Sequence, residues 1–333
     1  MEPFPEIRNG LLDSRDWQLL YLLDQNSKES LTSLAKSLRL SEQAIAYRIE
    51  RLKEAGIIRS FITFINSPSL GYSHFKVYLK LENAKEETEN RIFQLLARSP
   101  NIVWVVSLSG KYDLSFSILA RSPEEFSRLY QDIKKRIGKY IAEKNVVIAV
   151  MASGFTRDFL IGKKAAKPRF YGASGEPVSL DSIEAKILRA LSQNARKTFQ
   201  QIAEETKLTS DIVRYRIKKL EEAGIINGYT LSLDLERLGY EHYIVMLYLR
   251  NRTPNLEERI RSFAVNHPHV LFAVRAVGEH DYYLELEVKN HAELAENLKD
   301  FRRTFARHLR NFEVLRVVKE YTFDFFPIPE SNF

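Results

Sequence analysis

Two hydrophobic periods alternate along the chain. In the first, apolar residues recur every three or four positions, as at Ile45, Ile49 and Leu52, and this spacing predicts amphipathic helices. In the second, apolar and polar residues alternate, as in the stretch FKVYLKL at 75–81, and this spacing predicts a β-strand. The helical period comes first and the strand period follows, so a small helical module should precede a sheet-forming module.

The same succession occurs twice, at a constant offset. The pentapeptide EAGII at 54–58 recurs unchanged at 222–226, and a Gly-x-x-Asp turn occurs at 110–113 and again at 278–281. Because the offset holds without a gap over about 140 residues, the chain reads as a duplicated unit. The expected domains are a helix-turn-helix at 10–60, a ferredoxin-like domain at 61–153, a linker at 154–179, a second helix-turn-helix at 180–228 and a second ferredoxin-like domain at 229–325.

Each helical domain should contain three short helices. Ser41 and Thr209 are good N-cap residues for the third helix, and Gly56 is a good residue to end it. Only a few residues separate the second helix from the third, which is the helix-turn-helix arrangement. The third helices should span 42–55 and 210–223.

The sheet-forming modules follow the order β-α-β-β-α-β, which is the ferredoxin-like split motif. The predicted fold class is therefore α+β, with two repeats, each a winged helix-turn-helix followed by a ferredoxin-like module. We expect the two sheets to pack together, within a chain or between chains. The apolar faces expected to meet there contain Phe75, Val77 and Leu79 in one module and Ile244 and Met246 in the other.

Composition narrows the function classes. Lys and Arg total 50 against 43 Asp and Glu, a net charge of +7, which permits a polyanionic partner without requiring one. The sequence has no Cys, which excludes disulfides and thiolate metal sites. Six of the seven His lie in the second half without helical ligand spacing, so no metal site is expected. The Gly-, Pro- and Lys-rich segment 154–179 reads as a solvated tether.

Enzyme, membrane and secretion signals are missing from the sequence. It contains no Walker loop, GxGxxG turn, GxSxG elbow or HExxH helix, so we expect neither a cofactor nor enzymatic activity. The apolar runs are of strand length, and the N-terminal stretch lacks an apolar signal segment. A cytoplasmic protein without membrane contact is the expectation.

Two stretches resemble the Lrp/AsnC (leucine-responsive, feast/famine) family of transcriptional regulators. They read LAKSLRLSEQAIAYRIERLKEAGII at 34–58 and IAEETKLTSDIVRYRIKKLEEAGIINGYTLSLDLERLGY at 202–240, and the GKYD and GEHD turns follow. The resemblance implies sequence-specific binding to double-stranded DNA, control by an effector such as an amino acid, and a homo-oligomer. Members usually carry one unit per chain, so this chain resembles two fused subunits.

The residues expected to contact DNA lie on the third helices. N-terminal side chains of such a helix can reach base edges, while cations on its flank meet phosphates. The alternative is an ordinary surface helix with solvated ion pairs, since acids and bases balance over 42–54. The candidates are Ser41, Glu42, Gln43, Ala46, Tyr47, Arg48 and Arg51 in the first repeat, and Thr209, Ser210, Asp211, Arg214, Tyr215, Arg216, Lys218 and Lys219 in the second.

The candidate effector residues are Gly110, Asp113, Gly278 and Asp281. Glycine allows a ligand to approach backbone N–H groups, and the aspartate could pair with an α-ammonium group. In the resembled family this region lies near the amino-acid effector site. The alternative is a plain hairpin turn.

Two other functions remain open from the sequence. Sirohaem decarboxylases look like paired units of this type, but resemblance to them calls for a His-Arg stretch before the Leu-Gly-Tyr position. The corresponding stretches here read TFINSPS at 63–69 and LSLDLER at 231–237, without His. An architectural DNA-binding protein would use the same helices with little sequence preference.

Overall fold

The computed structural model describes residues 12–162, 169–172, 176–250 and 254–329. Both helix-turn-helix modules form as predicted, and the expected capping residues are in place. Ser41 accepts a hydrogen bond from the backbone N–H of Ala44, and Thr209 accepts one from that of Ile212. The helices are α1 (Ser14–Gln25), α2 (Leu31–Leu38) and α3 (Glu42–Glu54), then α6 (Ser182–Gln193), α7 (Phe199–Thr206) and α8 (Ser210–Glu222).

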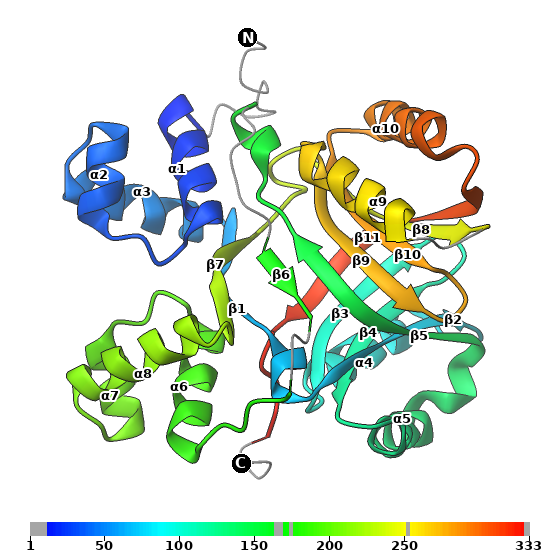
Figure 1. Cartoon of the computed structure of the whole chain (residues 1–333), viewed down its shortest axis with the longest axis horizontal. Helices are drawn as coiled ribbons and strands as arrows, with labels where there is room; N and C mark the ends of the chain where they lie inside the picture. Colours follow the sequence, from blue (N-terminus) through cyan, green and yellow to red (C-terminus); the bar gives the residue numbers. More distant parts are fainter. Residues whose placement is uncertain (1–11, 163–168, 173–175, 251–253, 330–333) are drawn as a thin grey trace.

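A two-stranded ribbon joins the two modules. Strand β1 (Ile58–Ile65) follows α3, strand β7 (Ile226–Leu233) follows α8, and the two pair antiparallel. Each first helix packs on the strand of the other repeat, α1 on β7 and α6 on β1. The two modules therefore lie side by side and are fixed to each other through the ribbon (Figure 1).

Both ferredoxin-like modules adopt the predicted order. The first comprises β2 (Ser73–Leu81), α4 (Glu86–Ala97), β3 (Ile102–Ser109), β4 (Leu114–Ala120), α5 (Pro123–Ile137) and β5 (Ile141–Gly154). The second comprises β8 (Glu241–Leu249), α9 (Pro254–Asn266), β9 (Val270–Val277), β10 (Tyr282–Val288), α10 (His291–Phe305) and β11 (Leu309–Phe323). Short 3-10 helices occupy Ser67–Leu70, Gly138–Tyr140 and Asp158–Leu160.

The two sheets join edge to edge within the chain and close into a barrel. Strand β3 pairs with β11, and β5 pairs with β9, both antiparallel. With the pairings inside each module, eight strands form a ring in the order β2-β4-β3-β11-β8-β10-β9-β5, since β5 also pairs with β2. Strand β6 (Arg169–Tyr171) adds to β5 outside the ring. Closure removes the exposed edges that each sheet alone would have.

In the first module, the apolar face of β2 packs against helices, so the prediction that this face meets the second sheet is wrong. Val77 and Leu79 belong to a core cluster with residues of α4 and α5, and the Phe75 ring stacks on Phe126 of α5 at 4.4 Å between centroids. Ile244 and Met246 do lie in the large central cluster. Because side chains alternate across a strand, the opposite face of β2 points into the barrel, and that face is more polar.

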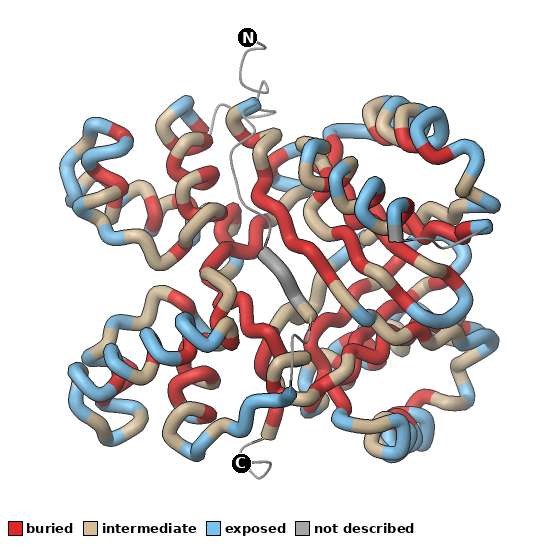
Figure 2. The backbone as a smooth tube through the Cα atoms, in the orientation of Figure 1, coloured by how far each residue is buried: buried red, intermediate tan, exposed pale blue. Residues whose placement is uncertain are grey.

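The start of the segment expected to be a solvated tether is buried. Strand β5 runs on to Gly154, and Phe155, Thr156 and Arg157 after it are buried. In Figure 2 the end of β5 is red, the colour of buried residues. Residues 163–168 and 173–175 of that segment lie outside the described residues. No helix in the described ranges is both long and apolar enough to cross a membrane. The same residues hold no cluster of three or more metal-ligating side chains.

Candidate nucleic-acid interface and central cavity

Helices α3 and α8 place their predicted DNA-facing sides in solvent. Ile45, Ile49 and Leu52 of α3 are buried, as are the equivalent residues of α8. On the opposite faces the tyrosine side chains stand out, with Tyr47 68% and Tyr215 57% exposed. The exposed candidates are Ser41, Glu42, Gln43, Tyr47, Thr209, Asp211, Arg214, Tyr215, Lys218 and Lys219, whereas Ala46, Arg48, Arg51, Ser210 and Arg216 are partly buried.

Three of the candidate arginines are bonded to the first helix of their own module. Arg48 Nη1 lies 2.7 Å from the Oδ1 atom of the buried Asp16, and Arg51 also pairs with Asp16. Arg216 Nη1 lies 2.6 Å from Asp181 Oδ2 and also pairs with Glu184 at the start of α6. These bonds fix the third helix against the first, so these arginines orient the helix in each module.

The two recognition helices differ in the charge of their exposed faces. Arg214 and Lys218 of α8 have side chains 64% and 73% exposed. At the positions 168 residues earlier, α3 carries Ala46 and Glu50. Repeat 2 thus presents two cations where repeat 1 presents a methyl group and a carboxylate. Within α8 these cations lie near acidic side chains, Arg214 3.8 Å from Asp211 and Lys218 3.6 Å from Glu222. The α8 face is the better match for a phosphate backbone.

The turns between the first and second helices bind the two modules to each other. Lys28 Nζ donates to the carbonyl oxygen of Ala195 at 3.2 Å, and Arg196 Nη1 donates to that of Ser27 at 2.6 Å. Lys28 and Arg196 are repeat-related residues, so this contact has a pseudo-two-fold character. Burial lowers the pKa of Lys28 to about 8, although nearby Glu221 opposes that shift.

The aspartates of the Gly-x-x-Asp turns are bonded to neighbouring strands. Asp113 accepts from the backbone N–H of Leu81 at 2.8 Å and from Lys80 Nζ at 2.7 Å. Asp281 accepts from the backbone N–H of Leu249 at 2.7 Å. Each carboxylate therefore ties its turn to the end of another strand of the same module, β2 for Asp113 and β8 for Asp281.

The glycines of these turns lie against the last strand of the opposite module. Gly110 has φ +135°, and a Cβ there would lie 3.0 Å from Leu315 on β11. Gly278 has φ +152°, and a Cβ there would lie 2.6 Å from Val147 on β5. Only glycine accommodates both the backbone angle and the close approach. These turns therefore help the two modules close the barrel.

A cavity of about 1190 Å³ lies between the ribbon and the barrel, and the sequence reasoning missed it. Its walls come from α1, from β1 and β7 of the ribbon, and from strands of both ferredoxin-like modules. Many of its apolar walls are aromatic, including Trp17, Phe64, Trp104, Phe272 and Tyr283.

A lysine lies at the inner wall of this cavity. Lys76 on β2 is 2% exposed, and its Nζ lies 3.3 Å from Glu285 Oε1 and 3.9 Å from the ring centre of Tyr283. His242 Nε2 is 3.5 Å from the other oxygen of Glu285. Burial lowers the pKa of Lys76, and it would raise that of Glu285, but the adjacent Lys76 and His242 lower the Glu285 pKa. Burial likewise lowers the pKa of neighbouring His74 to about 3, so that ring is neutral.

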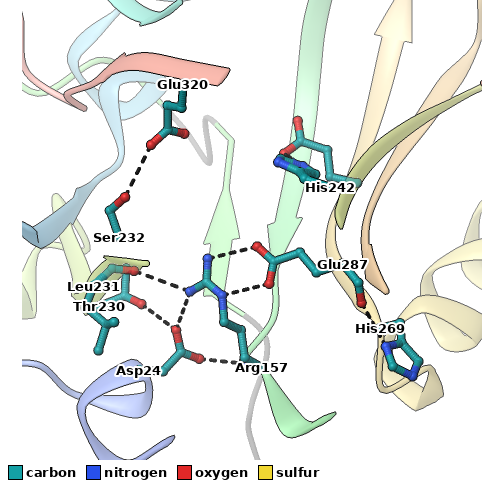
Figure 3. Close-up of polar contacts among 10 residues, drawn as sticks. Asp24, Arg157, Thr230, Leu231, Ser232, His242, His269, Glu287 and Glu320 are labelled. Carbon is teal, nitrogen blue, oxygen red and sulfur yellow. Dashed lines mark hydrogen bonds and ion pairs between the residues drawn. The ribbon is translucent and has the colours of Figure 1, made fainter. Parts of the chain in front are cut away.

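A second buried charge cluster ties a helix-turn-helix module to the barrel (Figure 3). Arg157 donates from Nε and Nη2 to the two oxygens of Glu287 on β10 at 2.8 and 3.0 Å. Its Nη1 donates to Asp24 Oδ1 on α1 at 2.6 Å, and its backbone N–H donates to Asp24 Oδ2 at 2.7 Å. Burial by itself would lower the pKa of Arg157, but the two carboxylates raise it.

This cluster, which we call the Arg157 triad, occurs on one side of the pseudo-two-fold axis. The repeat-related positions of Arg157, Asp24 and Glu287 carry Phe325, Ser192 and Leu119. The signal that could have pointed to Lys76 and Glu287 is a charged residue inside a predicted strand, whereas Arg157 follows β5 and Asp24 lies on α1, so the triad as a whole gives no such signal. In a duplicated sheet whose two faces are both covered, such a residue needs a buried partner.

Comparison with known proteins agrees with this architecture. The family model for winged helix-turn-helix DNA-binding domains matches residues 12–59 and 180–227. The HTH-type transcriptional regulator FL11 of Pyrococcus furiosus is 31% identical over 118 residues, which are 35% of this chain and 77% of that protein. The Bkd operon transcriptional regulator of Pseudomonas aeruginosa is 34% identical over 112 residues, 33% of this chain and 73% of that protein.

A solved structure extends the likeness to both repeats. The siroheme decarboxylase NirDL superposes with a TM-score of 0.60 over 93% of each chain, at 14% sequence identity. At that identity the likeness shows a shared fold alone.

Two winged helix-turn-helix modules with exposed recognition helices, held on a common barrel, define a DNA-binding transcriptional regulator. The chain belongs to the Lrp/AsnC family of such regulators and contains the family unit twice in tandem.

Proposed function

We propose that this regulator reads an asymmetric operator with two unlike recognition helices, of which α8 makes the stronger contact. The observation that carries the proposal is the charge difference between the exposed faces of α3 and α8. A homodimer presents two identical helices and favours a palindromic site. One chain that presents Arg214 and Asp211 on one side and Ala46 and Gln43 on the other favours two different half-sites.

The proposed contacts follow from side-chain chemistry. Arginine suits the O6 and N7 atoms of guanine, glutamine suits adenine, and aspartate accepts from cytosine N4. We assign base contacts to Arg214, Asp211 and Gln43, and phosphate contacts to Lys218 and Lys219, all of which are exposed. Arg48, Arg51 and Arg216 act on DNA through the orientation they give to the helix.

Selection from random double-stranded DNA tests the asymmetric operator. We expect a consensus with two unlike halves. A symmetric consensus would contradict the reading of both halves by one chain, and it would indicate two α8 helices from different chains. Enrichment without any consensus would indicate an architectural protein.

Two substitutions on α8 separate base from phosphate contacts. Arg214→Ala should weaken binding to the selected site by about 1–3 kcal/mol and relax preference at one base pair. Lys218→Ala should weaken binding to all sequences alike and reduce the salt dependence by about one ion. A uniform loss in the Arg214→Ala variant would refute its assignment to a base.

For the Gly-x-x-Asp turns we propose a structural role, supported by the bonds of Asp113 and Asp281 to strand backbone. An amino acid bound there through its ammonium group would compete with those bonds. A panel of amino acids in a thermal-shift assay tests this, with Asp281→Ala as the comparison. A ligand shift that is lost only in the variant would restore the effector interpretation of Gly110, Asp113, Gly278 and Asp281.

We also propose that the protein is not an enzyme, that it is located in the cytoplasm and that its chains associate into oligomers. A non-enzymatic role is supported by relatives that are regulators; bound tetrapyrrole in the purified protein together with its decarboxylation would overturn it. A cytoplasmic location is supported by archaeal and bacterial relatives that are transcriptional regulators. Further association of chains into a closed oligomer is tested by light scattering, and a strict monomer would exclude it.

A further inference from the structure

The central cavity is separate from the regions assigned so far. None of the turn residues Gly110, Asp113, Gly278 and Asp281 is among its described lining residues, and neither is any residue from 41 to 54 or from 209 to 222. At about 1190 Å³ it is somewhat larger than most small-molecule sites, which usually measure about 300–1,000 Å³. Its size and position require an explanation beyond DNA binding.

The lining combines aromatic walls with an excess of positive charge. Among the described lining residues there are seven Lys or Arg and five Glu. Four of those glutamates already bond protein groups, namely Glu285 to Lys76, Glu287 to Arg157, Glu241 to Arg316, and Glu320 to Trp104 and Ser232. Five of the seven cations are paired as well, since Arg59 and Arg237 both bond Asp234 and the other three bond the glutamates above. The excess positive charge therefore comes from Lys289 and Lys319, which line the cavity and are exposed to solvent. An anion is therefore favoured over a cation at this site.

The aromatic rings of the lining indicate which uncharged groups a ligand would carry. Phe64 packs against Phe272 and Phe325, with ring centres 6.3 and 4.5 Å apart, and all three line the cavity. Trp104 and Tyr283 flank the Lys76 ammonium group, at 4.3 and 3.9 Å from their ring centres. Rings of this kind give large apolar contact area and favour stacked or edge contacts with other rings.

We propose that the central cavity is a second ligand site, for an organic anion with an apolar, ring-containing body, and that its occupation changes DNA affinity. The ligand enters beside Lys289 and Lys319 and packs its rings between the ribbon and the barrel. This site differs in place and in ligand chemistry from an amino-acid site at the Gly-x-x-Asp turns.

The Arg157 triad gives the route from ligand to DNA. Arg157 and Glu287 both line the cavity. Arg157 pairs with Asp24 of α1, and its Nη1 also donates to the carbonyl oxygen of Leu231 on the ribbon at 3.3 Å. A ligand in the cavity therefore contacts the side chain that fixes the first helix-turn-helix module to β10. A shift of that module changes the relative placement of α3 and α8, on which operator affinity depends. This coupling rests on the proposed function, whereas ligand binding itself does not.

Ligand binding in the cavity can be followed by the intrinsic fluorescence of the protein. The chain has two tryptophans, Trp17 and Trp104, and both line the cavity. Anilinonaphthalenesulfonate, a ring-containing organic anion, absorbs where tryptophan emits, so it serves as the probe. Titration into the purified full chain should quench tryptophan emission in a saturable way, in Trp17→Phe and in Trp104→Phe alike. Unchanged emission, or quenching confined to one of the two variants, would overturn the site.

Charge-reversal variants test whether Lys289 and Lys319 attract the anionic ligand. Lys289→Glu/Lys319→Glu should raise the dissociation constant of the probe about tenfold at low salt. The matched control Lys134→Glu/Lys135→Glu makes the same net change on exposed lysines of α5 that are not among the described lining residues, and it should have little effect. Equal loss in both variants would show binding by net charge alone and would refute the site.

DNA binding is measured separately, with the operator recovered by selection. Saturating probe should change the dissociation constant of that operator about tenfold in the wild type and much less in Arg157→Lys. Saturable quenching without any change in DNA affinity would refute the coupling and leave the site in place. If no DNA sequence binds at all, the proposed function fails, while the fluorescence titration still decides the ligand site.

Discussion

The Arg157 triad allows the sharpest prediction about stability. The perturbation is Arg157→Met, which removes the cation and leaves a hydrophobic side chain of similar length. The side chains of Asp24 and Glu287 are each 1% exposed, and that of Arg157 is 9% exposed. The substitution therefore leaves two carboxylates buried without their cation.

The magnitude follows from the loss of a buried charge partner. Removing one member of a buried ion pair typically costs about 3–5 kcal/mol, since the remaining charge stays desolvated. Arg157→Lys retains the charge but loses the two parallel bonds to Glu287, so a smaller loss of about 1–3 kcal/mol is expected. The triple variant Arg157→Met/Asp24→Asn/Glu287→Gln should regain part of the loss, because its buried groups are neutral.

The assay is equilibrium urea unfolding followed by circular dichroism, with the change in the free energy of unfolding as the result. The matched control is Arg91→Met, which removes an exposed arginine that pairs with Glu87 one helical turn away. Such surface pairs contribute about 0–1 kcal/mol. If Arg157→Met loses no more stability than this control, the triad does not hold the module to the barrel.

Two further outcomes follow from burial and backbone geometry. The pKa of Lys28 is lowered from its ordinary value of 10.5 to about 8 in the folded protein. Between these two values the Lys28 amine is protonated in the unfolded chain but neutral in the folded one. The free energy of unfolding should therefore rise with pH from about 8 towards about 10. Thermal unfolding across this pH range should show the increase in stability in the wild type. If the same increase persists in Lys28→Met, a group other than Lys28 causes it. Gly278→Ala should lose about 2 kcal/mol or more, because it adds a clash with Val147 to backbone strain at positive φ. Gly239→Ala, at φ +76° with open space around its Cβ, should show only the strain, and equal losses in the two variants would exclude the clash.

The local structure and the duplication could both be predicted from the amino-acid sequence. Helix periodicity with N-cap residues such as Ser41 and Thr209 specified the helix-turn-helix modules, because those signals act within a few residues. The alternating pattern specified the βαββαβ order, and the constant offset specified that it occurs twice. The exposed faces of α3 and α8 also followed from the helical period.

Which strands meet, and what lies inside the barrel, depend on contacts between distant parts of the chain. Period-two alternation defines two faces of a strand, but it does not say which face meets helices and which meets a second sheet. From the sequence pattern, Lys76 and Glu285 could equally have faced solvent. In the structure, edge-to-edge closure of the two sheets buries them together. Arg157 sits in a stretch with the composition of a tether, yet its partners Asp24 and Glu287 are more than a hundred residues away. Contacts at that separation depend on the paired topology of the whole chain, so neither the cavity nor the triad is encoded in any local pattern.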